Sequence, residues 1–208
     1  MNLSYKKIIL FLVPWIILGA GMSLVRISLT DNTRYLWMNW NLFLALIPLL
    51  FAWLFEISSR IWVRVVLFLA WLFFLPNAIY MVTDFIHMNT STDIELLWYD
   101  GMMLFAYALV GVYVSWMTTV KIVEEIPTGT YGRYGIYGAI SLLTAFGIYL
   151  GRYIRWNTWD IVTRPLDLFV NVFDVITTHI HEPVFYLTII FFTLFSLVSV
   201  FSYKQLLK

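Results

Sequence analysis

Six long runs without a charged residue dominate this 208-residue sequence. Each is 18 to 21 residues long, and together they comprise residues 8–25, 35–55, 65–83, 101–120, 134–151 and 183–203. The hydrocarbon core of a bilayer is about 30 Å thick, so an α-helix needs roughly 20 apolar residues to cross it. The runs lack the alternation of apolar and polar residues that is typical of barrel strands. The sequence therefore predicts an all-α, polytopic membrane protein with six transmembrane helices in one domain, residues 1–208.

The composition agrees with a membrane location and excludes several classes of protein. Hydrophobic residues make up 62% of the chain and charged residues 12%, whereas about a quarter of the residues in a soluble domain are charged. The net charge is +1, and without a basic tract we expect no nucleic-acid partner. Cysteine is absent, which excludes disulfides, thiolate nucleophiles and cysteine-ligated metal clusters. No motif specifies a cofactor.

Six crossings place both ends of the chain on one side of the membrane. That side carries eight basic residues, Lys6, Lys7, Arg60, Arg64, Lys121, Arg133, Lys204 and Lys208. The opposite side carries five, Arg26, Arg34, Arg152, Arg155 and Arg164. The positive-inside rule then predicts cytoplasmic termini. We interpret the first run as an uncleaved anchor, because five further spans follow it.

The two connections on the predicted outer side, residues 84–100 and 152–182, are the longest and the most polar. Pro76 and Asn77 interrupt the third run shortly before the first of these connections. Burying an amide in hydrocarbon without a hydrogen-bond partner costs on the order of several kcal/mol. We therefore expect Asn77 to be hydrogen-bonded.

Three residues near this connection are candidates for catalysis. Asp84 and His87 are three residues apart and share one face if the helix continues. His87 would act as a general acid or base that Asp84 orients, with Asp100 nearby. The alternatives are a kinked helix that ends in a satisfied Asp–His pair and, for Asp100, a cap at the start of the fourth helix. No metal site is predicted, although these side chains are of the types that bind metals.

The stretch GRYIRWNTWD, residues 151–160, predicts a ligand-binding region. Its guanidinium groups match the planar geometry of carboxylates and phosphates. The predicted ligand-binding residues are Arg152, Arg155, Trp156, Asn157 and Asp160, together with Asn77 from the third span. Two alternatives remain open: an anchor at the lipid headgroups, or Arg–Asp pairs with Asp84 or Asp100.

Residues 164–178 have the spacing of an amphipathic helix. The apolar positions are Leu166, Phe169, Val170, Phe173 and Ile176, and the polar positions are Asp167, Asn171, Asp174 and Thr178. We expect this helix on the outer face. Its acidic side would be repelled by anionic lipid, so we favour docking on the helix bundle or a role as a lid. His179 and His181 are two residues apart and share no helix face, which is a weak metal motif.

Three stretches together are similar to a known family. They are WLFFLPNAIYMVTDFIHM (residues 71–88), Trp98-Tyr-Asp100 and residues 151–160, in this order among six spans. This pattern resembles the bacterial membrane proteins catalogued as domain of unknown function 1361, over about residues 35–203. The family's characteristic positions match Pro76, Asn77, Thr83, Asp84, His87, Asp100, Arg152, Trp156, Asn157 and Asp160. The resemblance implies a bacterial cytoplasmic membrane and six helices, and it implies no reaction.

These observations predict a multi-pass membrane protein with a polar site at the extracytoplasmic interface. The site would bind or modify an anionic lipid or lipid-linked substrate. One alternative is a small transporter or ion carrier with helices broken at Pro14, Pro48 and Pro76, although no ionisable group lies deep within a predicted span. The other is an accessory subunit whose salt-bridged network holds a membrane-protein partner. Without a recognisable nucleophile, the sequence leaves open whether the chain is an enzyme.

Overall fold

The computed structural model describes residues 5–30, 33–90, 94–156, 158 and 160–206, and all the elements in these ranges are helical. The α-helices are α1 (Tyr5–Thr30), α2 (Trp37–Ile57), α3 (Ile61–Tyr80), α4 (Leu97–Glu125), α5 (Thr130–Tyr149), α6 (Asp160–Thr163), α7 (Pro165–Thr177) and α8 (Pro183–Leu206). The shorter elements are the 3-10 helices η1 (Thr33–Tyr35), η2 (Met81–Thr90), η3 (Ile94–Leu96) and η5 (His179–His181), and the π-helical turn η4 (Leu150–Ile154).

The six predicted transmembrane helices are confirmed. By length and composition, the described chain has six helical segments able to cross a membrane, built on α1, α2, α3, α4, α5 and α8. Five of these segments contain the whole uncharged run that predicted them, and α2 is shifted by two residues relative to residues 35–55. The chain is therefore a membrane protein of the all-α class.

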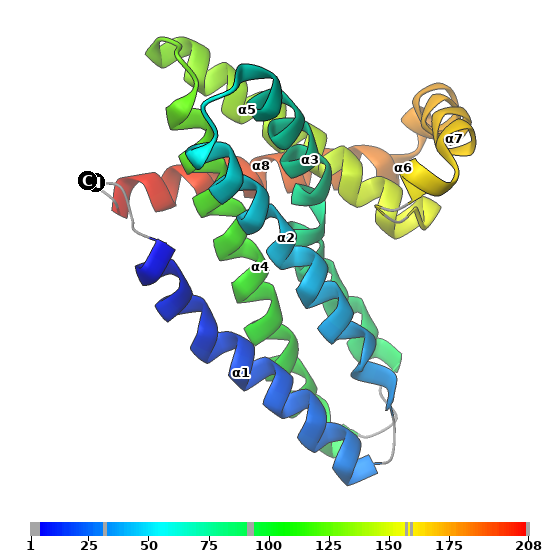
Figure 1. Ribbon diagram of the computed structural model, residues 1–208. Helices are drawn as coiled ribbons and strands as arrows, with labels where there is room; N and C mark the ends of the chain where they lie inside the picture. Colours follow the sequence, from blue (N-terminus) through cyan, green and yellow to red (C-terminus); the bar gives the residue numbers. More distant parts are fainter. Residues whose placement is uncertain (1–4, 31–32, 91–93, 157, 159, 207–208) are drawn as a thin grey trace.

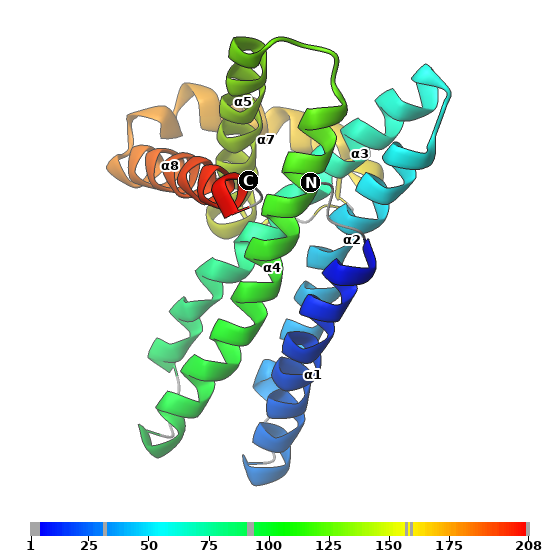
Figure 2. The same cartoon turned by 90° about the vertical axis from the view of Figure 1, so that its left-hand side faces the viewer.

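Helix α4 forms the centre of the bundle. In its most apolar window 78% of the residues are buried, and it packs against α1, α2, α3 and α8. Figures 1 and 2 show α1, α2 and α4 running in nearly the same direction, while α8 crosses α4 and α5 steeply. Small residues on α4 permit close packing. A Cβ added to Gly111 would collide with the backbone carbonyl of Ala78 in α3, so α3 and α4 touch backbone to backbone.

The two ends of the described chain meet at the C-terminal half of α4. Lys121 lies 4.4 Å above the ring of Tyr5, near the start of α1. Lys204, near the end of α8, forms a 2.6 Å ion pair with Glu124. Figures 1 and 2 accordingly show the N and C marks close together, away from the α1–α2 connection.

Two irregular segments continue regular helices and position polar residues. Helix α3 passes into η2, where three residues per turn align Met81, Asp84 and His87 along one edge. Helix α5 passes into η4, and Arg155 directly after it has a left-handed backbone with φ of 63°. The polar stretch after the third span and the first residues of the stretch after the fifth are thus helical rather than extended loops.

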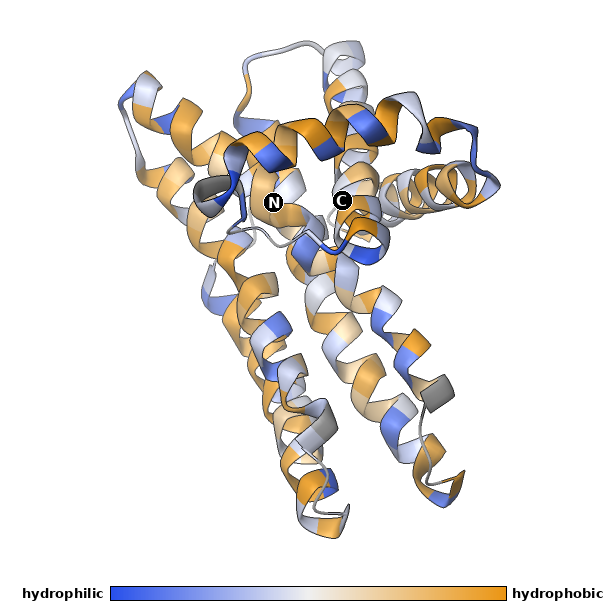
Figure 3. Ribbon diagram, turned by 90° about the vertical axis from the view of Figure 1, so that its right-hand side faces the viewer, coloured by the Kyte–Doolittle hydropathy of each residue, from blue (hydrophilic) through white to orange (hydrophobic). Residues whose placement is uncertain are grey.

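The amphipathic helix predicted within residues 164–178 is confirmed as α7. Docking on the bundle agrees with the contacts of α7, but these contacts do not involve the apolar residues that predicted the helix. All five of the apolar residues that predicted it are exposed: Leu166, Phe169, Val170, Phe173 and Ile176. The helix instead turns Leu168, Val172 and Val175 inward. Figure 3 shows α7 running across the face of the bundle, with apolar and polar residues both visible along it.

Candidate functional site

A partly open cavity of about 700 Å³ lies between α2, α3, α5, η4 and α7. Its lining residues are Trp37, Asn41, Leu44, Leu69, Leu72, Phe73, Pro76, Asn77, Tyr80, Leu143, Phe146, Gly147, Leu150, Gly151, Trp156, Thr158, Leu168 and Val172. This volume is in the range of small-molecule binding sites, about 300–1,000 Å³.

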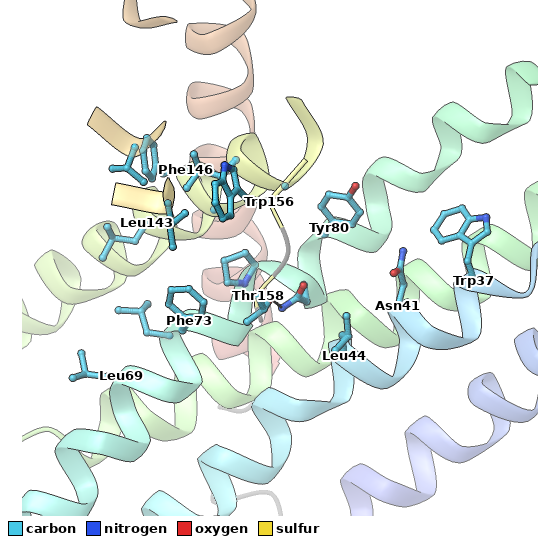
Figure 4. Close-up of a pocket in the computed structure, with 18 residues that line it drawn as sticks. Trp37, Asn41, Leu44, Leu69, Phe73, Tyr80, Leu143, Phe146, Trp156 and Thr158 are labelled. Carbon is cyan, nitrogen blue, oxygen red and sulfur yellow. Dashed lines mark hydrogen bonds between the residues drawn. The ribbon is translucent and has the colours of Figure 1, made fainter. Parts of the chain in front are cut away.

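The lining changes from apolar to polar along the cavity. Figure 4 shows Leu69, Phe73, Leu143 and Phe146 together in one part, from α3 and α5. Asn41, Tyr80 and Trp37 lie in the other part, where α2 faces the end of α3, and Thr158 lies between the two groups (Figure 4). The cavity therefore offers one region for hydrocarbon and another for hydrogen-bonding groups.

Pro76 and Asn77 stand at the junction between these regions. Gly147 of α5 lies so close to Pro76 that an added Cβ would be 2.5 Å from the proline Cγ. The Nδ2 of Asn77 donates to the carbonyl of Phe74 at 3.1 Å and to Oγ1 of Thr158 at 2.8 Å. The prediction that this amide is hydrogen-bonded is confirmed. The second bond fastens the segment after η4 to α3.

Asp84 and Arg152, predicted in different parts of the site, form a buried ion pair. The Nη2 of Arg152 lies 2.7 Å from Oδ1 of Asp84, whose side chain is fully buried. Asn41 donates to the other carboxylate oxygen at 3.4 Å, and the Nε of Arg152 donates to Oγ1 of Thr83 at 3.0 Å. Both oxygens of Asp84 are thus hydrogen-bonded, as a buried charge requires. The two polar stretches after the third and fifth spans meet here.

This pair changes what Arg152 offers to a ligand. Its charge is balanced by Asp84, and its guanidinium lies 4.3 Å from the ring centroid of Tyr80 in a cation–π contact. Tyr80 lines the cavity. Arg152 therefore positions Tyr80 and neutralises Asp84, which corresponds to the Arg–Asp alternative left open by the sequence.

Arg155 differs from Arg152 in its exposure, its ion pairing and its backbone conformation. It is exposed, and its guanidinium makes no ion pair with a residue that the structure describes. It lies within electrostatic range of the Tyr80 hydroxyl at the cavity. Among the described residues other than glycine it alone has a positive φ, a conformation that costs a residue with a Cβ about 1–2 kcal/mol.

The remaining residues of the 151–160 stretch form a smaller group beside the cavity. Trp156 lines the cavity, and Arg164 lies 4.9 Å from its ring centroid. Arg164 also pairs with Asp160 at 2.9 Å, and this carboxylate raises the pKa of Arg164 above its ordinary value. Asn157, the other predicted ligand-binding residue, lies outside the described residues.

His87 and Asp100 lie outside the cavity lining. The ring of His87 makes an edge contact with Trp37, whose centroid is 4.7 Å away and which does line the cavity. Asp100 accepts hydrogen bonds from Arg26 at 2.7 and 3.3 Å and from the Tyr35 hydroxyl at 2.9 Å. Asp100 thus belongs to the contact between α1 and α4.

Three ionisable residues lie next to the predicted spans rather than deep within them. Arg26, Asp84 and Asp100 lie within helical segments able to cross a membrane, and all three are buried. Each stands one residue beyond an uncharged run. A predicted span defined as an uncharged run must end at the first charged residue. The helix continues past that residue because its charge is paired.

Of the 18 residues that line the cavity, only Asn77 and Trp156 were predicted as site residues, and those missed include Trp37, Asn41 and Thr158. Asn41 and Trp37 share one face of α2, four residues apart, and Thr158 belongs to the other connection. The amide of Asn41 inside an apolar run was an available signal, since such a group requires a partner. Within the described ranges, no group of three or more His, Asp or Glu side chains is arranged to hold a metal.

The helices and the cavity define a class: a multi-pass membrane protein with a partly open cavity whose lining is apolar in one part and polar in another. Residues 40–198 match the family model described as "Protein of unknown function (DUF1361)". The chain belongs to this family, as the sequence resemblance predicted. No curated protein and no solved structure matches the chain.

Proposed function

We propose that this protein binds an amphipathic lipid with an anionic headgroup in the cavity between α2, α3, α5 and α7. The observation that carries the proposal is the change of lining along one continuous cavity, from leucine and phenylalanine to amide, hydroxyl and indole groups. Ligand sites are commonly apolar with a few converging polar groups that fix orientation. An acyl or prenyl chain matches the first region, and a headgroup matches the second.

The apolar region supports a ligand that comes from the bilayer. Leu69, Phe73 and Leu143 line the cavity and are also exposed at the surface of the bundle, by 56%, 37% and 50%. They belong to the middle parts of α3 and α5, which are segments able to cross a membrane. The opening between these helices therefore faces hydrocarbon, and a membrane lipid can insert its chain sideways.

The headgroup region supports an anionic ligand through Arg155 rather than Arg152. Arg152 is already balanced by Asp84, whereas Arg155 is exposed near Tyr80. Arg155 also occupies a left-handed position where glycine would be less strained. Strain of this kind is concentrated at functional sites. A guanidinium at that position makes a charge-assisted hydrogen bond to a phosphate or carboxylate.

The geometry of the cavity favours ligand binding over catalysis. Among the described lining residues there is no histidine or carboxylate. Asp84 is fully buried with both oxygens engaged, and His87 stands behind Trp37. The acid–base role predicted for Asp84, His87 and Asp100 would require these side chains to leave their present contacts, so we place ligand recognition first.

We place the site at the extracytoplasmic side of a bacterial cytoplasmic membrane. The basis is the excess of basic residues, eight against five, on the side that carries both ends of the chain. The side with Arg155 and the α1–α2 connection would then face away from the cytoplasm.

The test uses photoactivatable phosphatidylglycerol and phosphatidylcholine with the purified protein in bilayer nanodiscs. We expect cross-links to α3 and α5 residues of the cavity, with phosphatidylglycerol preferred. Arg155→Ala should reduce the preference at least about tenfold, because a hydrogen bond to a charged group contributes roughly 1.5 kcal/mol or more. Arg60→Ala removes the same charge from an exposed position near the start of α3 and should change nothing.

A second variant tests the chain-binding region separately. Leu143→Trp narrows the opening between α3 and α5 with a larger apolar side chain, and because Leu143 is half exposed the fold should tolerate the change. We expect cross-linking of both lipids to decrease. The proposal is wrong if both lipids label the cavity equally and neither Arg155→Ala nor Leu143→Trp alters the yield.

A further inference from the structure

Helix α7 presents three different sectors around its circumference. At 3.6 residues per turn, Leu168, Val172 and Val175 lie on one side. The polar residues Asp167, Asn171, Asp174 and Thr178 lie on a second side. The third side carries the five exposed apolar residues Leu166, Phe169, Val170, Phe173 and Ile176. A helix in contact with only protein and water has two environments and needs two sectors. The third sector requires a third environment.

The first sector faces the protein. Leu168 and Val172 line the cavity, and Val175 is 1% exposed in a cluster with Tyr149 of α5 and Phe185 of α8. A wall of the cavity is therefore supplied by α7.

The second sector has the chemistry of a surface in contact with water. Asp167 and Asp174 are exposed, and the Asn171 amide bonds only back to the carbonyl of Asp167, at 2.8 Å. At the end of the helix, Asp174 lies 3.8 Å from His179. Exposed carboxylates of this kind remain in water.

The third sector is apolar throughout and exposed. Leu166 and Phe169 are 79% and 74% exposed, and Val170, Phe173 and Ile176 are between 51% and 64% exposed. Together these five residues form a continuous apolar side, whereas the protein-facing side has three residues. We infer that this sector is inserted among the acyl chains of the bilayer, and that α7 lies in the membrane interface as a lipid-anchored wall of the cavity.

The position of α7 in the chain favours lipid over a protein partner. It is connected at both ends to segments able to cross a membrane, through η4 to α5 and through η5 to α8, so it is held beside the bilayer. At its N-terminus Arg164 covers the indole of Trp156, and tryptophan and arginine are typical of the membrane–water boundary. The three sectors of α7 would then face protein, water and hydrocarbon, respectively.

The charge on α7 adds a specific expectation about lipid composition. Its polar sector carries Asp167 and Asp174 and no basic residue, so anionic headgroups do not attract it. Burial of apolar area alone drives the insertion. The inserted depth should therefore be no greater in phosphatidylglycerol than in phosphatidylcholine, unlike the headgroup preference proposed for the cavity, and the two proposals can fail independently.

The absence of cysteine makes single-cysteine spin labelling of the full chain direct. Phe169→Cys and Phe173→Cys report on the third sector, and Asp167→Cys is the matched control in the polar sector. Leu194→Cys, at an exposed position of α8, gives the reference for lipid, and Tyr131→Cys gives the reference for water. Each labelled protein is reconstituted in phosphatidylcholine bilayers. Collision rates with oxygen, which partitions into lipid, and with a water-soluble nickel chelate are then measured.

We expect the labels at 169 and 173 to collide with oxygen as the α8 reference does and to be shielded from the nickel chelate. The label at 167 should behave in the opposite way. Accessibility of 169 and 173 to the chelate would overturn the inference, because the sector would then face water. Shielding from both reagents would also overturn it, since a second copy of the chain or another protein would then cover the sector.

Discussion

At the scale of residues, the ion pairs Asp84–Arg152 and Arg26–Asp100 are the most consequential interactions. In both, the carboxylate is fully buried and receives donors from two other elements. Forming such a pair yields little net stability, because desolvation offsets the Coulombic attraction. Breaking it is costly, because the remaining charge stays buried. These pairs therefore fix which helices pack together more than they add to stability.

Arg152→Met should lower the free energy of unfolding by about 3–5 kcal/mol, since the carboxyl group of Asp84 is left fully buried without its partner. The measurement is thermal or denaturant unfolding of the purified protein. In the double variant Asp84→Asn/Arg152→Met, most of this loss should be recovered, because no buried charge remains. Equal destabilisation in the single and double variants would show that packing of the arginine side chain, rather than its charge, matters.

Arg155→Gly should have the opposite effect on stability. Its left-handed backbone carries a Cβ penalty that glycine lacks, so we expect a gain of about 1 kcal/mol. Arg155→Ala keeps the Cβ and should give no such gain, although both variants lose the proposed headgroup contact. A gain for alanine equal to that for glycine would mean that relief of charge repulsion, not of strain, stabilises the variants.

At the scale of elements, α3 is held between α4 and α5 by two glycine contacts. Gly111 of α4 meets the Ala78 carbonyl, and Gly147 of α5 meets Pro76. These contacts hold Pro76 and Asn77 in the wall of the cavity. The small residues are thus responsible for the shape of the site as well as for packing.

Gly111→Ala should destabilise the protein by about 1–3 kcal/mol, the usual range for overpacking. The atom in the way is backbone and cannot turn aside as a side chain does. Gly138→Ala is the matched control in α5, because nothing lies within 4 Å of its added Cβ, and higher helix propensity should leave it neutral or slightly stabilised. Unfolding of the two variants under identical conditions makes the comparison, and equal stability would contradict the close contact.

The sequence predicted where the helices run but not where they end. The length of an apolar run determines whether it can cross a bilayer, and this holds without knowledge of neighbours. The ends depend on whether a charge finds a partner, and the partners of Arg26 and Asp84 are 74 and 68 residues away. For the same reason Asn77 was predicted to need a partner, whereas Thr158, 81 residues further on, was not identified as that partner.

At the scale of the whole molecule, the paired ends of the chain define one side of the bundle. Tyr5 and Lys204 both contact the C-terminal half of α4, while the α1–α2 connection and η2 lie towards the opposite end (Figure 1). An even number of spans requires this arrangement. It also separates the ionic cluster around Glu124 from the cavity.

Labelling of single cysteines with a membrane-impermeant maleimide in intact cells should follow this arrangement. Tyr131→Cys, exposed near the start of α5, should react only after the membrane is opened, because we place it in the cytoplasm with both ends of the chain. Trp98→Cys, exposed near the start of α4, should react in intact cells. The reverse pattern would keep six spans but invert the orientation, and labelling of both positions in intact cells would contradict an alternating bundle.

The Arg26–Asp100 pair has a consequence for how the chain enters the membrane. When α1 leaves the ribosome, the partner of Arg26 lies 74 residues behind it, which takes roughly 4–15 s to synthesise. During that interval the guanidinium has to stay at the lipid headgroups, which its place one turn before Thr30 allows. Pairing with Asp100 of α4 then buries the arginine, so this pair cannot fix α1 in the bundle before α4 has been made.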